Sequence, residues 1–155
     1  MASAKRPERV IQCLPPDWGE GWRHVWLGVS VESQPYMHRV KTLIEIPAKI
    51  RFISAEPLLE EIDFLEEMDG KRPIDQIDWG ILGGESGNET GKHLYRPCEL
   101  SWLERGLTDL MTHTRAKVFI KQLGSHLRKT LHLRHKHGGD PSEWAPHLRV
   151  TDYPG

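Results

Sequence analysis

The sequence predicts an α/β fold, with a four-stranded, mainly parallel sheet flanked by helices. Two observations predict it: four short apolar runs end in small or acidic residues, and segments long enough for crossover helices separate them. A continuous apolar run is typical of a strand buried on both faces, and such strands belong to parallel sheets covered by helices. The four runs are Val25 to Glu32, Ile50 to Glu56, Trp79 to Glu85 and Lys117 to Gln122.

The segments between the runs predict the remaining elements of a single α/β domain. Residues 1–24 contain several prolines and glycines and are expected to be irregular. Apolar residues at helical spacing predict helices over Tyr36 to Glu45 and over Glu99 to Thr112. Residues 58–68 fit either a short helix or a looser excursion. The βα core therefore covers 25–123, and a polar, histidine-rich tail covers 124–155.

Length and composition limit the class of protein. The chain has 155 residues, which suits one domain and falls short of the roughly 250 residues of a closed (β/α)₈ barrel. No apolar run approaches the ~18 residues of a membrane span, and the polar first ten residues do not resemble a secretion signal. We therefore expect a cytoplasmic protein. The net charge of −1 gives no global electrostatic case for nucleic acid.

Charge is nevertheless unevenly distributed along the chain. Seven acids and no base lie between Glu56 and Asp69, while residues 121–149 are rich in bases and histidines. Such runs fit either solvated faces or interaction surfaces. If the acidic run contacts a partner, the side chains expected to do so are Glu60, Glu61, Asp63, Glu66 and Glu67.

Polar residues at the strand ends form the candidate ligand site. The carboxyl ends of parallel strands gather at one edge of a sheet, where α/β proteins build their sites. Three strand-end carboxylates could reach a ribose, an amine or a metal, with Lys121 as a basic neighbour; the alternative is a structural ion-pair cluster. The candidate residues are Ser30, Glu32, Ser54, Glu56, Gly83, Gly84, Glu85, Ser86, Lys121 and Gln122.

The glycine-rich loop from Gly83 to Gly87 is the strongest local signal. Glycines let backbone amides approach a ligand closely, although a tight turn without a ligand fits equally well. The loop matches neither the P-loop nor the dinucleotide motif. The two distant cysteines and the tail histidines have no strong metal-ligand spacing, so the sequence assigns no metal site and no catalytic residue.

Seven strings in fixed order carry a resemblance to a known family. They are KRPERV, WLGVSVESQ, PAKIRFISAEPLL, DWGILGGESG, YRP, FIKQLG and GGDPSEWAPHLRVTDYP. Together they resemble the C-terminal part of a phage-encoded, radical-SAM-like family of unknown function. Members of that family begin with a three-cysteine segment for a [4Fe–4S] cluster, which this chain lacks. The resemblance therefore implies half of a (β/α) barrel and a ligand-binding edge, without implying radical chemistry.

Two functions follow from this resemblance. The first is a non-enzymatic phage or mobile-element protein without a cofactor, which inhibits a host defence complex in the manner of an anti-CRISPR protein. Its acidic run would imitate a nucleic-acid backbone against a basic groove. The second is a subunit of a split radical-SAM enzyme that binds S-adenosylmethionine or a nucleoside. In either case half a barrel leaves an edge and an apolar face open. The tail from Gly124 onward, a second copy of the chain or a foreign partner could cover that face, and we expect self-association or a host partner.

Overall fold

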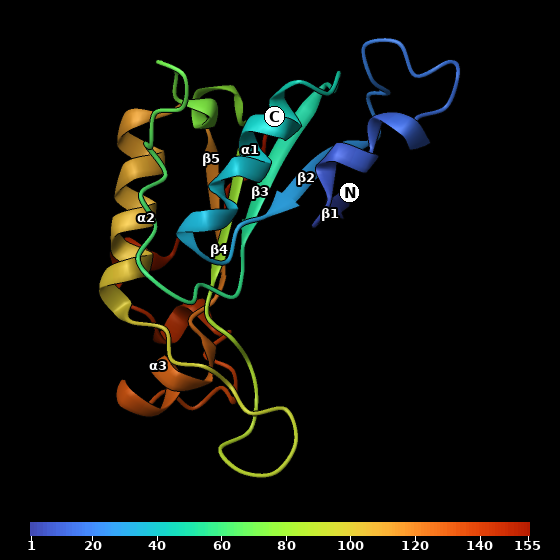
Figure 1. The fold of residues 1–155 in the computed structure, drawn as a ribbon. Coiled ribbons are helices and arrows are strands. Elements are labelled where there is room, and N and C mark those ends of the chain that lie inside the picture. Colours follow the sequence, from blue (N-terminus) through green and yellow to red (C-terminus); the bar gives the residue numbers. More distant parts are fainter.

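The computed structural model describes residues 1–155 and contains one five-stranded parallel sheet (Figure 1). The strands lie side by side in chain order, from β1 to β5. Parallel strands in sequential order mean that every crossover connects neighbouring strands. The strands are β1 Ala2–Ala4, β2 Trp26–Ser30, β3 Ile50–Ala55, β4 Trp79–Gly83 and β5 Lys117–Gln122.

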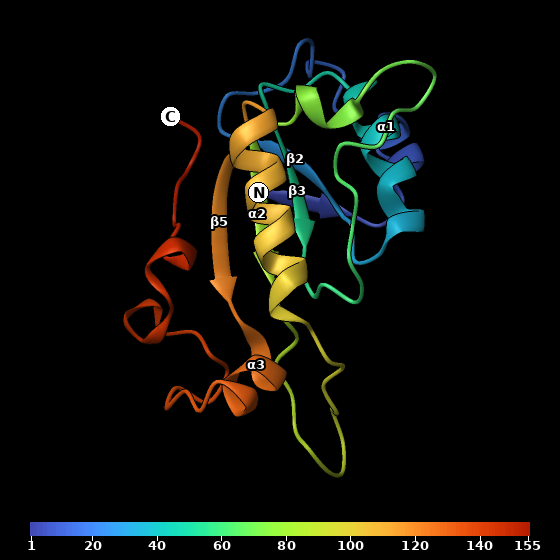
Figure 2. The same cartoon turned by 90° about the vertical axis from the view of Figure 1, so that its left-hand side faces the viewer.

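Three α-helices accompany the sheet: α1 His38–Ile44, α2 Leu100–His113 and α3 Gly124–Thr130. Helix α1 contacts β2 and β3, and α2 contacts β4 and β5, both on the same face of the sheet (Figures 1 and 2). None of the helices has the length and apolar character needed to cross a membrane. Short 3₁₀ helices lie at Pro7–Arg9, Ile11–Cys13, Gln34–Met37, Pro73–Gln76, Pro141–Glu143 and Pro146–Leu148.

The expected strand count of four was wrong, because β1 adds a fifth strand at the N-terminus. Ala2 and Ala4 pair in parallel with Leu27 and Val29 of β2. Residues 1–24 are therefore not wholly irregular. Ala2–Ala4 is not part of an apolar run. It forms a strand nevertheless, because an edge strand is held by its hydrogen bonds to a neighbour and needs little burial of its own.

The four expected strands and the two expected helices are confirmed. Strands β2 to β5 begin within one residue of the apolar runs, and α1 and α2 lie where the helical spacing placed them. The alternative left open for residues 58–68 resolves into an irregular segment that contains no helix. We call residues 57–68 the β3–β4 excursion.

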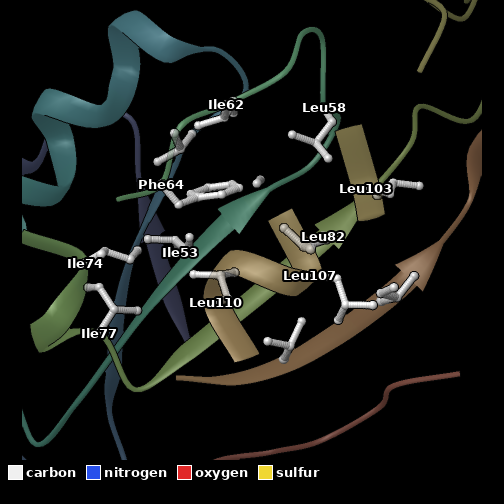
Figure 3. Close-up of a cluster of buried hydrophobic side chains, with 14 of the residues drawn as sticks. Ile53, Leu58, Ile62, Phe64, Ile74, Ile77, Leu82, Leu103, Leu107 and Leu110 are labelled. Atoms are coloured by element: carbon white, nitrogen blue, oxygen red, sulfur yellow. The ribbon is translucent and has the colours of Figure 1, made fainter. Parts of the chain in front are cut away.

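The hydrophobic core lies between the sheet and its helices. Side chains on the helix-covered face of the sheet, such as Val29, Ile53 and Leu82, are fully buried there. The β3–β4 excursion contributes Ile62 and Phe64 to the same core (Figure 3). The irregular excursion therefore covers the sheet, a role that a short helix would otherwise have in this segment.

The opposite face of the sheet carries a separate aromatic cluster. Phe52, Trp79 and Ile81 are buried there, with Trp26 and Phe119 packed beside them. Successive side chains of a strand point to opposite faces, so each strand supplies both the helix-covered core and this second face. No α-helix covers the aromatic face.

The tail from residue 124 onward folds back along β5. Ile120 donates a backbone hydrogen bond to Val150 (2.8 Å), and Asp152 donates one to Val118 (2.9 Å). Thr151 therefore forms an antiparallel bridge with Phe119 of β5. Figure 2 shows the tail, in red, running beside β5. The polar composition of the tail concealed this role, which covers one of the two open edges of the sheet.

Candidate functional site

A groove of about 460 Å³ lies on the aromatic face of the sheet, and we call it the sheet groove. Four of the five strands contribute to it, together with both ends of the chain. It combines an apolar floor with a polar rim at the carboxyl ends of the strands. The lining residues are Met1, Ser3, Phe52, Ser54, Glu56, Trp79, Ile81, Phe119, Lys121 and Tyr153.

Strand periodicity explains why these residues line one groove. Phe52 and Ser54 are two positions apart on β3, as are Phe119 and Lys121 on β5, so both pairs point to the same face. Gly28 of the neighbouring β2 leaves room for the Phe52 ring, because a Cβ atom at Gly28 would lie 2.4 Å from that ring. The aromatic residues lie toward the start of the strands and the polar ones toward their carboxyl ends.

Trp79 organises the floor of the groove. Its ring centroid lies 5.6 Å from Trp26, 5.9 Å from Phe52 and 6.1 Å from Phe119. Tyr153 of the tail lies 5.0 Å from the Trp79 ring, and Trp79 Nε1 donates to the Asp152 carbonyl at 2.8 Å. These contacts fix the floor, since such aromatic pairs stabilise beyond their buried area.

The polar rim of the groove is built around one ion pair. Lys121 Nζ donates to Glu56 Oε1 at 2.9 Å, so Lys121 is the basic neighbour of one strand-end carboxylate. The Glu56 side chain is 19% exposed and that of Lys121 is 57% exposed. Ser54 lines the groove beside them, and Ser30 Oγ lies 3.3 Å from Ser3 Oγ on the adjacent strand. A ligand in the groove would therefore meet a carboxylate, an ammonium group and hydroxyls.

Glu32 and Glu85 lie outside the groove and are neutralised separately. Glu32 is buried and pairs with Arg39 (3.2 Å) and Lys5 (3.5 Å). Glu85 accepts three hydrogen bonds from Arg96, which hold the pKa of Glu85 below its ordinary value. The three carboxylates therefore pair with different basic residues, and only Glu56 lines the sheet groove.

The basic partners Lys5, Arg39 and Arg96 were not among the sequence candidates. Lys5 and Arg96 do lie in two of the strings that carry the family resemblance, KRPERV and YRP. Their pairing with Glu32 and Glu85 depends on how the loops fold back on the sheet edge. No sequence spacing predicts such a contact.

The glycine loop uses its backbone groups within the protein. Gly84 N donates to the Gln122 carbonyl (3.1 Å), Gln122 Nε2 donates to the Gly84 carbonyl (3.0 Å), and Gly87 N donates to Ser125 Oγ (3.0 Å). Gly83 is buried, with its carbonyl accepting from Leu58 N, whereas Ser86 is exposed. Because these backbone groups already have partners within the protein, the geometry favours a tight turn without a ligand over a loop that presents its amides to one.

Three acids of the acidic run contact the side chain or backbone of Gln34. Glu60 accepts a hydrogen bond from Gln34 N (2.6 Å), Glu66 accepts one from Gln34 Nε2, and Asp63 N donates to Gln34 Oε1 (2.7 Å). Glu61 pairs with Arg105 at 3.0 Å. Of the five candidate acids, Glu67 alone has neither an ion pair nor a hydrogen bond. The acidic run is therefore partly a structural element of the β3–β4 excursion.

The cysteines and histidines do not fit a cluster or a metal. Cys13 is exposed, while Cys98 is buried and its thiol pKa is raised to about 12 by that burial. Two such cysteines cannot supply the three thiolates of the cluster that the family resemblance implies. In the tail, His135 Nδ1 already accepts a hydrogen bond from Gly139 N at 3.0 Å. No group of three His, Cys, Asp or Glu side chains is placed to hold a metal ion.

Comparison with known proteins finds a family model that matches most of the chain. A family model described as a protein of unknown function (DUF5131) matches residues 1–144. All five strands and all three α-helices lie within the matched range, whereas Tyr153 and the bridge at Thr151 lie beyond it. No curated protein and no solved structure matches the chain.

Proposed function

We propose that this chain, which belongs to the DUF5131 family of proteins of unknown function, is a binding protein whose ligand site is the sheet groove. One observation carries the proposal: an aromatic floor and a charged rim meet in a single hollow on the open face of a parallel sheet, with the rim at the carboxyl ends of the strands. Small-molecule sites in proteins are predominantly apolar hollows of roughly 300–1,000 Å³ with a few convergent polar groups. The sheet groove, at about 460 Å³, has this size and composition.

The lining favours a planar ligand that carries hydroxyl or amino groups, such as a nucleoside or S-adenosylmethionine. Phe119 is half-buried and Tyr153 is 56% exposed, so both rings offer a surface for stacking. The Glu56 carboxylate can accept hydrogen bonds from ribose hydroxyls or an ammonium group, and Lys121 can donate to a carboxylate. This is the ligand class expected of a split radical-SAM subunit.

The strand order supports the proposal that the fold is half of a (β/α) barrel. In such a barrel, parallel strands follow one another in chain order, with helices on the outer face alone. Doubly wound sheets instead reverse their strand order and carry helices on both faces. The unpaired edge of β1 and the open aromatic face further support association with a second copy or with a partner.

We expect Glu56→Gln to weaken binding of S-adenosylmethionine and of adenosine about tenfold or more, and Lys121→Ala to weaken binding of S-adenosylmethionine to a similar extent. Glu56→Gln removes the negative charge, and Lys121→Ala removes the ammonium group; a hydrogen bond to a charged group contributes about 1.5–3 kcal/mol. Isothermal titration calorimetry of the purified chain measures the affinities. Lys117→Ala is the matched control, since Lys117 is an exposed lysine of the same strand outside the groove.

Two outcomes would contradict the groove proposal. The first is that neither compound binds the wild-type chain. The second is that Glu56→Gln and Lys121→Ala bind as tightly as Lys117→Ala does. Thermal unfolding of each variant, measured without ligand, checks that the fold is retained.

The second candidate function is inhibition of a host defence complex through the acidic run. It is favoured by the exposure of Glu61, Asp63 and Glu67, which present negative charge on the surface of the β3–β4 excursion. Arg105 is the basic group paired with Glu61 and Asp63, at 3.0 and 4.0 Å. Such a surface could occupy a basic nucleic-acid groove of a CRISPR complex by charge complementarity.

For this candidate we expect Glu61→Lys/Glu67→Lys to abolish inhibition, because charge reversal at an interface slows association and weakens binding strongly. Glu60 and Glu66 are left unchanged, since their contacts with Gln34 hold the excursion in place. The measurement is transformation of a CRISPR-bearing bacterium with a targeted plasmid. Glu56→Gln should leave inhibition intact, and a wild-type chain that restores no transformation would eliminate this function.

A further inference from the structure

Two segments form a basic surface at the carboxyl end of the sheet, and we call it the basic end. They are the loop of residues 86–97 and the α3 region of residues 124–137. Gly87 and Ser125 join them by two hydrogen bonds (3.0 and 3.1 Å), and Lys129 pairs with Glu89 at 3.0 Å. Figures 1 and 2 show the loop and α3 together at the lower end of the molecule.

The charge of the chain is segregated at this end. The two segments contain six Lys or Arg residues and one acid, Glu89, which gives +5 in a chain whose net charge is −1. Five of the nine histidines also lie there. The sheet groove accounts for none of these residues.

Several of these basic residues form no ion pair within the protein. Lys92, Arg128 and Lys136 are exposed and pair with no carboxylate, and Arg134 is 92% exposed although it contacts Glu143. Five acids face the basic end, and four of them are already paired: Glu85 with Arg96, Glu89 with Lys129, Glu99 with His126 and Glu143 with Arg134. The fifth, Asp140, lies near Arg134 and His135. Unpaired like charges held close together repel one another and favour an anionic partner.

Two adjoining hollows give this surface a shape. One, of about 450 Å³, is lined by Arg128, Lys129, His132 and Leu133 and contains no acid. The other, of about 380 Å³, is lined by Asn88, Glu89, Thr90, Leu94, Tyr95 and Lys129. Lys129 lines both, so the two hollows adjoin at this residue.

The second hollow offers stacking surface beside the charge. Leu94 is 56% exposed, and the half-buried Tyr95 ring lies 6.5 Å from the His126 ring. A positively charged groove beside an aromatic platform is the arrangement with which proteins bind single-stranded nucleic acid. Binding to duplex DNA, in contrast, needs only basic side chains that contact the phosphates, and no stacking surface.

We propose that the basic end binds single-stranded nucleic acid. The phosphate backbone lies over the acid-free hollow, where Arg128 and Lys129 contact it and Lys136 adds charge. A base stacks on Tyr95, on the side where Glu89 would repel a phosphate. This site is separate from the sheet groove and independent of the ligand proposed there.

The test uses fluorescence anisotropy with a labelled oligothymidine of about 20 nucleotides, longer than the ~4–16 nucleotides that one binding domain covers. We expect Arg128→Glu/Lys136→Glu to weaken binding tenfold or more. The salt dependence should also fall by about 0.7 in log–log slope for each phosphate that the variant no longer neutralises. Lys49→Glu/Lys71→Glu makes the same change of net charge at exposed, unpaired lysines elsewhere and should stay within about twofold of wild type.

A second pair of variants separates stacking from charge. Tyr95→Leu should weaken binding about fivefold or more, the loss expected for one stacked base, whereas Tyr95→Phe should bind as wild type does. The proposal is overturned by any of four results: no binding at low salt, equal losses in the two double variants, equal affinity for a duplex, or displacement by polyglutamate as effective as by unlabelled oligothymidine. Polyglutamate displacement would identify an acidic polypeptide as the partner instead.

Discussion

Phe64→Ala is expected to lower the free energy of unfolding by about 3–5 kcal/mol, the usual cost of removing a buried phenylalanine ring. Phe64 lies in the β3–β4 excursion, is fully buried, and packs against α2 in the cluster that Figure 3 shows. Its ring edge lies so near Gly106 of α2 that a Cβ atom there would be 3.0 Å from Phe64 Cε2. Because the backbone of α2 already lies this close to the ring, we expect the helix to relax little into the cavity that Phe64→Ala would leave.

Urea unfolding followed by circular dichroism measures the loss of stability. Glu67→Ala is the control from the same segment, because Glu67 is exposed and has no partner. It should change stability by less than about 0.5 kcal/mol. A loss below about 1 kcal/mol for Phe64→Ala would mean that the excursion is dispensable for the core.

The strands were predictable because burial on both faces leaves a strong signal. Runs such as Trp79 to Gly83 are apolar throughout, and they lie between the helix-covered core and the aromatic face. Strand β1 was not predictable, since Ala2–Ala4 is short, exposed and held by its ladder with β2. Its existence depends on the position of a neighbour, which local sequence does not encode.

The β3–β4 excursion shows the same limit of local sequence. Its apolar residues fit helical spacing, yet the segment is irregular and is held by Gln34, a residue distant in the chain. Asp63 also accepts a hydrogen bond from Leu65 N at 3.0 Å, a local turn that competes with a helix. Tertiary contacts therefore decided between the two alternatives that the sequence left open.

The candidate site was predictable in its rim and not in its floor. Parallel strands bring their carboxyl ends to one edge, which is why Ser54, Glu56 and Lys121 lie together. An open apolar face was expected of half a barrel, but its residues were not named as part of a site, because alternation along the strands does not show which face Phe52 and Trp79 occupy. Tyr153 joins them because the tail folds back along β5, which was one of the expected ways to cover the open face, although no single residue of the tail was predicted to do so.

The second large effect is expected at the end of β4, where Gly84→Ala should destabilise the fold by about 3 kcal/mol or more. A Cβ atom at Gly84 would lie 2.2 Å from the Leu123 carbonyl oxygen and 3.1 Å from Gly124 Cα. Both neighbours are backbone, so relief requires the end of β5 to move away, and overpacking of this kind typically costs about 1–3 kcal/mol and occasionally more. Ser86→Ala, an exposed position of the same loop, is the control.

The same variant decides what the glycine loop does. If Gly84 serves the close approach of β4 to β5 and α3, the thermal midpoint of Gly84→Ala should fall by roughly 6 °C or more for a domain of this size, while Ser86→Ala stays near wild type. If the glycine instead serves the approach of a ligand, the midpoint of Gly84→Ala should be unchanged and binding of adenosine in calorimetry should be lost. The hydrogen bonds of Gly84 with Gln122 and of Gly87 with Ser125 favour the first outcome. A stable Gly84→Ala variant would therefore overturn the structural interpretation of this loop.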